Sequence, residues 1–351
     1  MASASSLSSK DILLFFKDVE ADRFLPGDRY LKRIVRPAWE LLHSNQKKTG
    51  FRVSFEMLEA ALRKAGYRVH VNRYDLARRN PTHPVGIVGF PIILDGWTLP
   101  NPALLGPSLY DHPGLKPDLF NDSRFKLLVT LADWQHKMHQ RGYGDRCVQW
   151  FAGIDLDRWP DLSGHPKTID FLVYDKIRWD HDALSESLLN PILAELARRG
   201  LRTETLRYKF HDHAKLKDAM ARAKALLFIC EHETQGLAYQ EAMASGLPVL
   251  AWDPGRLVDP IWQRFDKAPP ETSSVPFFSP SCGETFATLE AFPEALTRFL
   301  ARQSSYDPRG YVKAHLSQEE SARRYADAYV SLAGDAGRVA QREAVNAAAE
   351  A

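Results

Sequence analysis

The chain has 351 residues, with 46 Lys and Arg against 44 Asp and Glu and a formal net charge of +2. This length suggests two domains, and the near-neutral charge excludes a protein whose main role is to coat nucleic acid. Three widely spaced cysteines, Cys147, Cys230 and Cys282, exclude a disulfide framework and a zinc ribbon and fit a reducing compartment.

Short apolar runs alternate with amphipathic helical patterns along the first half of the chain. In chain order we expect a strand at 11–16, a helix at 52–65, strands at 67–71, 85–94 and 125–130, a helix at 130–140 and a strand at 147–151. Such alternation is typical of an α/β domain built on a parallel sheet.

The same alternation begins afresh after residues 155–167, a stretch without periodicity that we interpret as a linker. We expect strands at 169–174, 203–208, 225–230 and 248–252, and helices at 184–199, 213–222, 239–245 and 292–302, with a last helix after the Ser317–Glu320 capping box. The sequence therefore predicts two Rossmann-like domains facing each other across a cleft, at 1–165 and 166–311. Residues 312–351 are expected to form a C-terminal helix returning towards the first domain, with a loose tail.

The segment from Cys230 to Trp252 carries the chemical signal. A buried strand is expected to end at Cys230, and a helix to begin near Gly236, where a glycine lets a ligand approach unpaired backbone N–H groups. Such a helix start suits a phosphate. Glu233 lies before the helix and Glu241 lies eight residues further on, so their carboxylates suit the hydroxyls at the two ends of a diphosphate-linked ligand.

Glu233 and Glu241 have seven residues between them, and Glu241 begins the run Glu-Ala-Met-Ala-x-Gly-x-Pro-Val. This pattern resembles the donor signature of retaining GT-B glycosyltransferases of family 4, the group 1 glycosyltransferases. The resemblance implies that Glu233 contacts the transferred sugar, that Gln235, Gly236 and Leu237 hold the diphosphate, and that Glu241 binds the ribose. Gln235 departs from the phenylalanine that is common there. The alternative for the glutamate pair is a solvated surface.

The family usually places an Arg and a Lys after the first strand of its second domain, to neutralise the donor phosphates. Lys176 and Arg178 occupy that place here with a tighter spacing, and on an extended strand end they would share one side. We therefore name them with Glu233 as the candidate catalytic residues. The alternative is a solvated strand edge.

Three further residues are candidate substrate contacts. Gly50 is either a glycine of an active-site loop or a simple helix start, His112 either contacts substrate or supports its loop, and His232 either contacts the ligand or packs within the motif loop. The sequence offers no metal-ligand motif and no Asp-x-Asp pair in the cleft segments, so we expect neither a metal nor a cofactor besides the nucleoside-diphosphate sugar.

The sequence contains no apolar run long enough for a membrane span and no signal-peptide pattern, so we expect a cytoplasmic protein. Arg29 to Arg36 interleaves four charges with aromatic and aliphatic residues, which indicates either a solvated helix face or a peripheral contact with an acceptor or the inner membrane face. The expected partners are a nucleotide sugar and a glycan, lipid-linked or small-molecule acceptor, with no nucleic acid.

The sequence thus predicts a retaining, hexosyltransferase-like enzyme of glycan or glycoconjugate biosynthesis. Two alternatives stay open, because one scaffold can host several activities. One is a nucleotide-sugar epimerase, and the other is a non-catalytic protein that binds sugar nucleotides.

Overall fold

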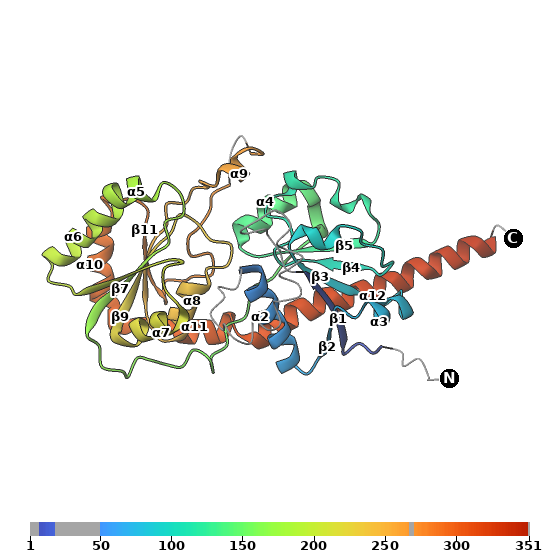
Figure 1. The fold of residues 1–351 in the computed structure, drawn as a ribbon, viewed down its shortest axis with the longest axis horizontal. Coiled ribbons are helices and arrows are strands. Elements are labelled where there is room, and N and C mark those ends of the chain that lie inside the picture. The colour runs from blue at the N-terminus through green and yellow to red at the C-terminus, as the bar shows by residue number, and fades with distance from the viewer. Residues whose placement is uncertain (1–6, 18–49, 267–269, 350–351) are drawn as a thin grey trace, which may run out of the picture. The chain divides into compact units, whose positions relative to one another are not determined.

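The computed structural model describes residues 7–17, 50–266 and 270–349 (Figure 1). The described chain separates into two compact units. The first comprises the residues up to 111, residues 115–129 and those from 323 onward, and the second comprises residues 112–114 and 130–322. The basic segment Arg29–Arg36 lies outside the described residues. The domain boundaries predicted at 165 and 311 follow the two sheets and stay predictions.

The first sheet has six strands in the order β2-β1-β3-β4-β5-β6. Its strands are β1 (Asp11–Lys17), β2 (Arg68–Val71), β3 (Val85–Gly89), β4 (Ala103–Leu105), β5 (Phe125–Thr130) and β6 (Cys147–Gln149). The accompanying helices are α2 (Gly50–Lys64), α3 (Tyr74–Arg79) and α4 (Asp133–Tyr143). β1 pairs in parallel with both β2 and β3, and its first five residues are buried, as is usual for a central strand covered on both faces.

The long C-terminal helix α12 (Gln318–Ala349) contributes to the core of the first unit. The Tyr329 hydroxyl accepts a hydrogen bond from the Leu13 N–H at 2.9 Å and donates one to the Pro84 carbonyl. Gly86 of β3 lies directly against the Tyr325 hydroxyl, and a Cβ atom there would overlap it. The last helix of the chain therefore packs against β1 and β3 of the same unit.

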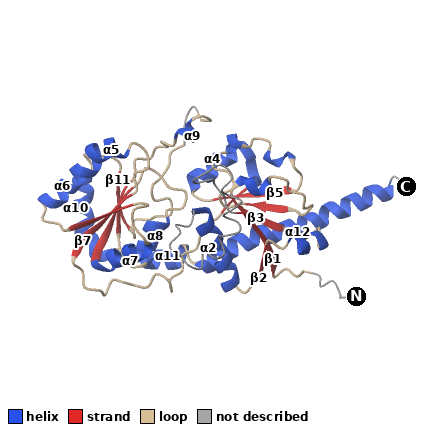
Figure 2. Ribbon diagram, viewed as in Figure 1, coloured by secondary structure: helices blue, strands red, loops and turns tan. Residues whose placement is uncertain are grey.

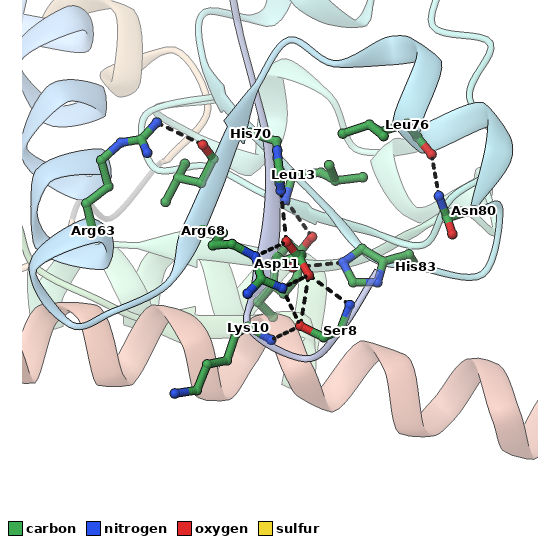
Figure 3. A network of polar contacts seen from close by, with 12 residues as sticks. Ser8, Lys10, Asp11, Leu13, Arg63, Arg68, His70, Leu76, Asn80 and His83 are labelled. Carbon is green, nitrogen blue, oxygen red and sulfur yellow. Dashed lines mark hydrogen bonds and ion pairs between the residues drawn. The ribbon is translucent and has the colours of Figure 1, made fainter. Parts of the chain in front are cut away.

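A polar network closes the amino end of the first sheet (Figure 3). The buried Asp11 carboxylate accepts hydrogen bonds from Arg68 Nη2 at 2.6 Å, His70 Nε2 at 2.9 Å and the Ser8 N–H at 2.8 Å. His83 Nε2 donates to the Asp11 carbonyl at 2.8 Å. The Arg68 guanidinium holds the pKa of Asp11 well below its usual value, and burial lowers the pKa of His83. Asp11 thus joins β1 to β2 through its carboxylate and to the chain before β3 through its backbone carbonyl.

Asp11→Asn is expected to destabilise the first unit by about 1–3 kcal/mol at pH 7, because the buried carboxylate loses its charge-assisted hydrogen bonds with Arg68 and His70. The pKa of Asp11 is 3.8 when unfolded and lower when folded, so its contribution is present above that pH and is lost as the pH falls below it. The lowered pKa of His83 also makes the protein less stable as the pH falls, beginning below the unfolded pKa of 6.5. Denaturant unfolding at pH 7 and pH 3 should show the mutant deficit shrinking at pH 3. A deficit that stays constant would contradict this account.

The second sheet has five parallel strands in the order β11-β10-β9-β7-β8. They are β7 (Ile169–Asp175), β8 (Thr203–Arg207), β9 (Ala223–Ile229), β10 (Val249–Trp252) and β11 (Gly283–Phe286). Its helices are α5 (His181–Leu184), a π-helix (Ser185–Leu189), α6 (Asn190–Arg198), α7 (His213–Arg222), α8 (Leu237–Ala244), α9 (Pro260–Gln263), α10 (Phe292–Arg302) and α11 (Pro308–His315). Figure 2 shows α6 and α10 on one side of this sheet and α7 and α8 on the other.

Most predicted elements are confirmed to within two residues, including α7, α10 and β5 with their predicted bounds. The Ser317 hydroxyl accepts the Glu320 N–H at 3.2 Å, as one half of the capping box requires. The strand predicted over 85–94 is too long, because Pro91 begins a 3₁₀ turn after Gly89. Two short strands, β4 and β11, were not predicted, since β4 has only three residues and β11, with the sequence Gly-Glu-Thr-Phe, lacks the apolar pattern of a strand.

Candidate functional site

The candidate residues of the second unit gather where β7 and β9 end. Asp175 and Ile229 pair at the last rung of these neighbouring parallel strands, so the loops that follow them begin side by side. The Lys176 N–H continues the pairing by donating to the Ile229 carbonyl at 2.8 Å. Residues 176–180 and 230–236 therefore leave the same edge of the sheet, which is where α/β proteins bind ligands.

Lys176 and Glu233 form a buried ion pair between these two loops. The Lys176 ammonium contacts Glu233 Oε1 directly, and the two side chains are 12% and 9% exposed. The Cys230 thiol also donates to Glu233 Oε1, at 3.3 Å. Burial opposes both charges, but the pKa of Lys176 lies above its usual value because the Glu233 carboxylate outweighs burial, and the pKa of Glu233 is lowered by Lys176 and Arg178. Both groups are therefore charged at neutral pH.

Arg178 lies in the same loop but has different partners. Its guanidinium donates to the His232 carbonyl, lies 3.3 Å from His232 Nδ1 and covers the Trp179 ring at 4.3 Å. β7 ends at Asp175, so the extended strand that we expected to place Lys176 and Arg178 on one side does not reach them. The two cations are brought to one edge of the sheet by a loop rather than by strand alternation.

Glu231 fixes this loop and was not singled out from the sequence. Its carboxylate is almost fully buried and accepts the backbone N–H groups of Arg178 at 2.9 Å and Trp179 at 3.1 Å. Burial raises the pKa of Glu231 despite these hydrogen bonds. A carboxylate directly after a buried strand was the available signal, because such a group must find donors nearby.

His232 is packed within an aromatic cluster. Its ring stacks on Trp179 at 5.0 Å and on Trp262 at 5.6 Å, and Trp134 meets it edge-on at 5.8 Å. Burial lowers the pKa of His232 to about 3, so the imidazole is neutral. Trp134 also donates its indole N–H to the Glu233 carbonyl at 2.9 Å. These tryptophans, which sequence reasoning missed, hold the loop that carries Glu233.

Gln235, Gly236 and Leu237 form the turn into α8. The Gln235 side chain points inward, accepting the Ala152 N–H at 2.9 Å and donating to Gln240 Oε1 at 2.7 Å. Gly236 has φ +78°, and a Cβ atom there would overlap the Tyr239 ring, so glycine is required on both counts. Leu237 then begins the helix, whose first N–H groups have no intrahelical acceptor. The turn thus supplies backbone donors, while the Gln235 side chain is used structurally.

Glu241 lies on α8 with a buried carboxylate that has no hydrogen bond or ion pair to any described residue. Burial raises its pKa to about 8, although the positive charges of Arg158, Lys217 and Lys176 oppose the shift. A buried carboxylate without a donor is costly unless a ligand satisfies it. The Glu241 carboxylate is therefore free to accept hydrogen bonds from a ligand, and His232 Nε2 is a fully buried polar atom of the motif that has no hydrogen-bond partner among the described residues.

The remaining two candidates, His112 and Gly50, have other surroundings. His112 is buried, accepts the Gly114 N–H on Nδ1 at 2.9 Å, contacts Asp266 through Nε2 at 3.1 Å and stacks on Phe265 at 4.8 Å, which fits the loop-support alternative. Gly50 is the exposed first residue of α2, and a Cβ atom there would meet nothing within 4 Å. Neither makes a described contact with Lys176, Glu233 or Glu241.

Two features are absent from residues 7–17, 50–266 and 270–349, the part of the chain that the structure describes. No group of three or more His, Cys, Asp or Glu side chains in this part of the chain is arranged to hold a metal ion. Within the same ranges, no helix has the length and apolar character that crossing a membrane requires.

Comparison with known proteins identifies the architecture. No family model and no curated protein matches the sequence. The structure is similar to that of AviGT4, a glycosyltransferase involved in avilamycin A biosynthesis, with a TM-score of 0.54 and 15% identity over 92% of this chain and 98% of that one. Sucrose-phosphate synthase from Thermosynechococcus elongatus gives a TM-score of 0.46 at 14% identity, covering 92% of this chain and 98% of that one. The fold is therefore α/β with two parallel sheets, matching GT-B glycosyltransferases, and the predicted fold class is confirmed.

Proposed function

We propose that the chain is a glycosyltransferase that moves a sugar from a nucleoside diphosphate to an acceptor hydroxyl. The observation that carries this proposal is the Lys176–Glu233 ion pair ahead of α8, with the unpartnered Glu241 carboxylate buried further along that helix. In this arrangement Glu233 can accept hydrogen bonds from sugar hydroxyls, and Glu241 can accept them from ribose hydroxyls. Lys176 and the backbone N–H groups at the start of α8 can bind phosphate. The resemblance of the motif to family 4 adds that the anomeric configuration is retained.

In the proposed complex the diphosphate lies against the first turn of α8 and the Lys176 ammonium, because a helix N-terminus and a cation both favour an anion. The ribose hydroxyls then donate to Glu241, and the transferred sugar reaches Glu233. Donor binding replaces the Lys176–Glu233 contact with two new partners, phosphate for Lys176 and sugar hydroxyl for Glu233. Neither buried charge is then left without an opposite charge or a hydrogen bond, which would otherwise be costly.

The reaction breaks the bond between the anomeric carbon and the diphosphate oxygen and forms a bond from that carbon to the acceptor oxygen, whose proton is released. Negative charge grows on the leaving diphosphate, so fixed positive charge at Lys176 and Arg178 and the helix N–H groups stabilise the transition state more than the ground state. Arg178 is already held in place by the His232 carbonyl. We propose no metal, no further cofactor and no enzymic nucleophile.

The acceptor, its origin and the place of action remain proposals from the sequence. We propose that residues 1–165 carry the acceptor side, that the acceptor is a glycan, a lipid-linked molecule or a small molecule, and that the protein acts in the cytoplasm or peripherally at the inner membrane face. A hexose donor in glycan or glycoconjugate biosynthesis fits the motif.

Thermal shift with a panel of nucleoside diphosphates and nucleotide sugars tests donor binding first, since a ligand at 100 times its dissociation constant adds about 2.7 kcal/mol of stability. The stabilising nucleotide sugar is then incubated with candidate acceptors, and the products are separated. Free nucleoside diphosphate with a glycosylated acceptor supports the proposal. An isomerised nucleotide sugar would favour an epimerase, and binding without any turnover would favour a sugar-nucleotide-binding protein.

Proton release from the Glu241 carboxyl on nucleotide binding provides a separate test. At pH 7 the carboxyl is largely protonated, because burial raises its pKa to about 8. Ribose hydroxyls that donate to it favour the ionised form, so nucleotide binding should release close to one proton, and affinity should rise by up to about tenfold per pH unit towards pH 8. Calorimetry at pH 7 in buffers of different ionisation enthalpy measures the release. Glu241→Gln should abolish it, and an unchanged release in that variant would exclude this role.

A further inference from the structure

A pocket of about 380 Å³ lies within the second unit, beside the loop after β7 that carries Arg178. It is bounded by the chain after β7, by α5 with the π-helix that follows, and by the segment after β10. We call it the Trp179 pocket and define it by Trp179, Asp180, Ser187, Glu231, Trp252 and Arg256. Its volume lies within the usual range for small-molecule sites. Lys176, Glu233 and Glu241, which we assign to the donor, do not line it.

The Trp179 indole borders both the pocket and the loop that carries Arg178. The Arg178 guanidinium lies over the ring at 4.3 Å and the His232 ring stacks on it at 5.0 Å. Arg178 Nη2 is also only 3.3 Å from His232 Nδ1, so both groups must cover the same face of the indole. Trp179 is only half-buried and is one of the residues that line the pocket, so a ligand there lies against this residue.

Two side chains of the pocket, Asp180 and Arg256, carry opposite charges and have no side-chain partner among the described residues. Arg256 is exposed and makes no hydrogen bond or ion pair with any described residue through its guanidinium. Asp180 is exposed with φ +46°, an uncommon backbone conformation outside glycine, and its carboxylate does not cap α5. Ser187 belongs to the π-helix Ser185–Leu189, a rare element that is often found at functional sites. The pocket therefore presents a free donor and a free acceptor beside an indole.

We propose that the Trp179 pocket binds a saccharide unit. A sugar ring has an apolar face that packs on an indole, and its hydroxyls both donate and accept hydrogen bonds, as Asp180 and Arg256 together require. A purely apolar ligand would displace water from these exposed charges without replacing its hydrogen bonds, and a simple anion would face the Asp180 and Glu231 carboxylates. The site stands whether or not the chain transfers sugar. The saccharide can be free or can be a unit of an acceptor glycan.

Saturation-transfer NMR with methyl glycosides of glucose, galactose, mannose and N-acetylglucosamine, and with the corresponding disaccharides, tests this site directly. Binding of at least one methyl glycoside indicates a single-sugar site, whereas binding of disaccharides alone indicates a site for a glycan chain. Arg256→Ala and Asp180→Asn should each weaken binding about tenfold, the loss expected for one charged hydrogen bond. Absence of binding across the panel would overturn the proposal.

Arg264→Ala is the matched control, because Arg264 is also exposed, lies in the same segment after β10, has no described partner and does not line the pocket. It should bind saccharide like the wild type. Equal binding by Arg256→Ala and the wild type would place the sugar elsewhere and overturn the assignment. All three variants should melt at the wild-type temperature, since each replaced side chain is exposed and unpaired.

Saccharide binding at Trp179 should also affect Arg178, because the Arg178 guanidinium lies over the Trp179 ring. A saturating saccharide is expected to change nucleoside-diphosphate affinity by about fivefold or more. Unchanged affinity would remove this coupling while leaving the saccharide site intact. If no nucleotide binds at all, the proposed glycosyl transfer fails, and the pocket is judged by the NMR titration alone.

Discussion

Glu233→Gln is expected to lower sugar transfer by about 10²–10³-fold, the effect of losing one strong transition-state hydrogen bond, while binding of the bare nucleoside diphosphate stays near wild type. Glu233 precedes the α8 N-terminus, so in the proposed complex it lies beyond the diphosphate from the ribose end held by Glu241. Glutamine keeps the size and one acceptor oxygen but loses the charge. The Lys176 ammonium, which contacts Glu233 in the free protein, is then released towards phosphate.

Initial transfer rates and calorimetry with free diphosphate separate these two effects. Glu186→Gln, which removes the same charge from an exposed position of the second unit, should leave both unchanged. Full transfer activity in Glu233→Gln would exclude the sugar contact. Loss of diphosphate binding as well would instead assign Glu233 to the structural hydrogen bonding of its loop, where Cys230 is its other neighbour.

The fold could be predicted from the sequence because both sheets are parallel and covered by helices. β1 and β9 are continuous apolar runs for that reason, and α7 and α10 have clear helical periodicity. β11 could not be predicted, since its sequence Gly-Glu-Thr-Phe has no strand pattern and its pairing with β10 fixes it. Tertiary pairing, not local propensity, decides such edge strands.

The candidate site was predictable where residues are close in the chain and unpredictable where the fold brings them together. Glu233, Gly236 and Glu241 belong to one motif, and their spacing around a helix start is readable directly. Trp134 lies 99 residues before its partner Glu233, so no local pattern indicates the contact. Gln235 was a departure from the family pattern whose consequence could not be inferred, and its side chain is now seen to bind the backbone of Ala152.

Lys176→Met is expected to destabilise the protein by about 3–5 kcal/mol, because it leaves the buried Glu233 carboxylate without its principal cation. Methionine keeps most of the length of the side chain, so the loss of packing is small. The double variant Lys176→Met/Glu233→Gln removes both charges and should regain most of the lost free energy of unfolding. Denaturant unfolding followed by tryptophan fluorescence gives all the values needed for a double-mutant cycle.

Lys224→Met is the matched control, since Lys224 pairs with Asp170 at 2.7 Å in the same unit but is 45% exposed. An exposed ion pair contributes only about 0–1 kcal/mol, so this change should be nearly silent. If Lys176→Met were equally silent, the pair with Glu233 would be solvated and its charges free of any burial cost. If the double variant were no more stable than Lys176→Met, the loss would come from the contact of Lys176 with the Tyr208 ring, at 4.8 Å, and not from an unpaired carboxylate. Recovery in the double variant would therefore show that each of the two buried charges depends on the other.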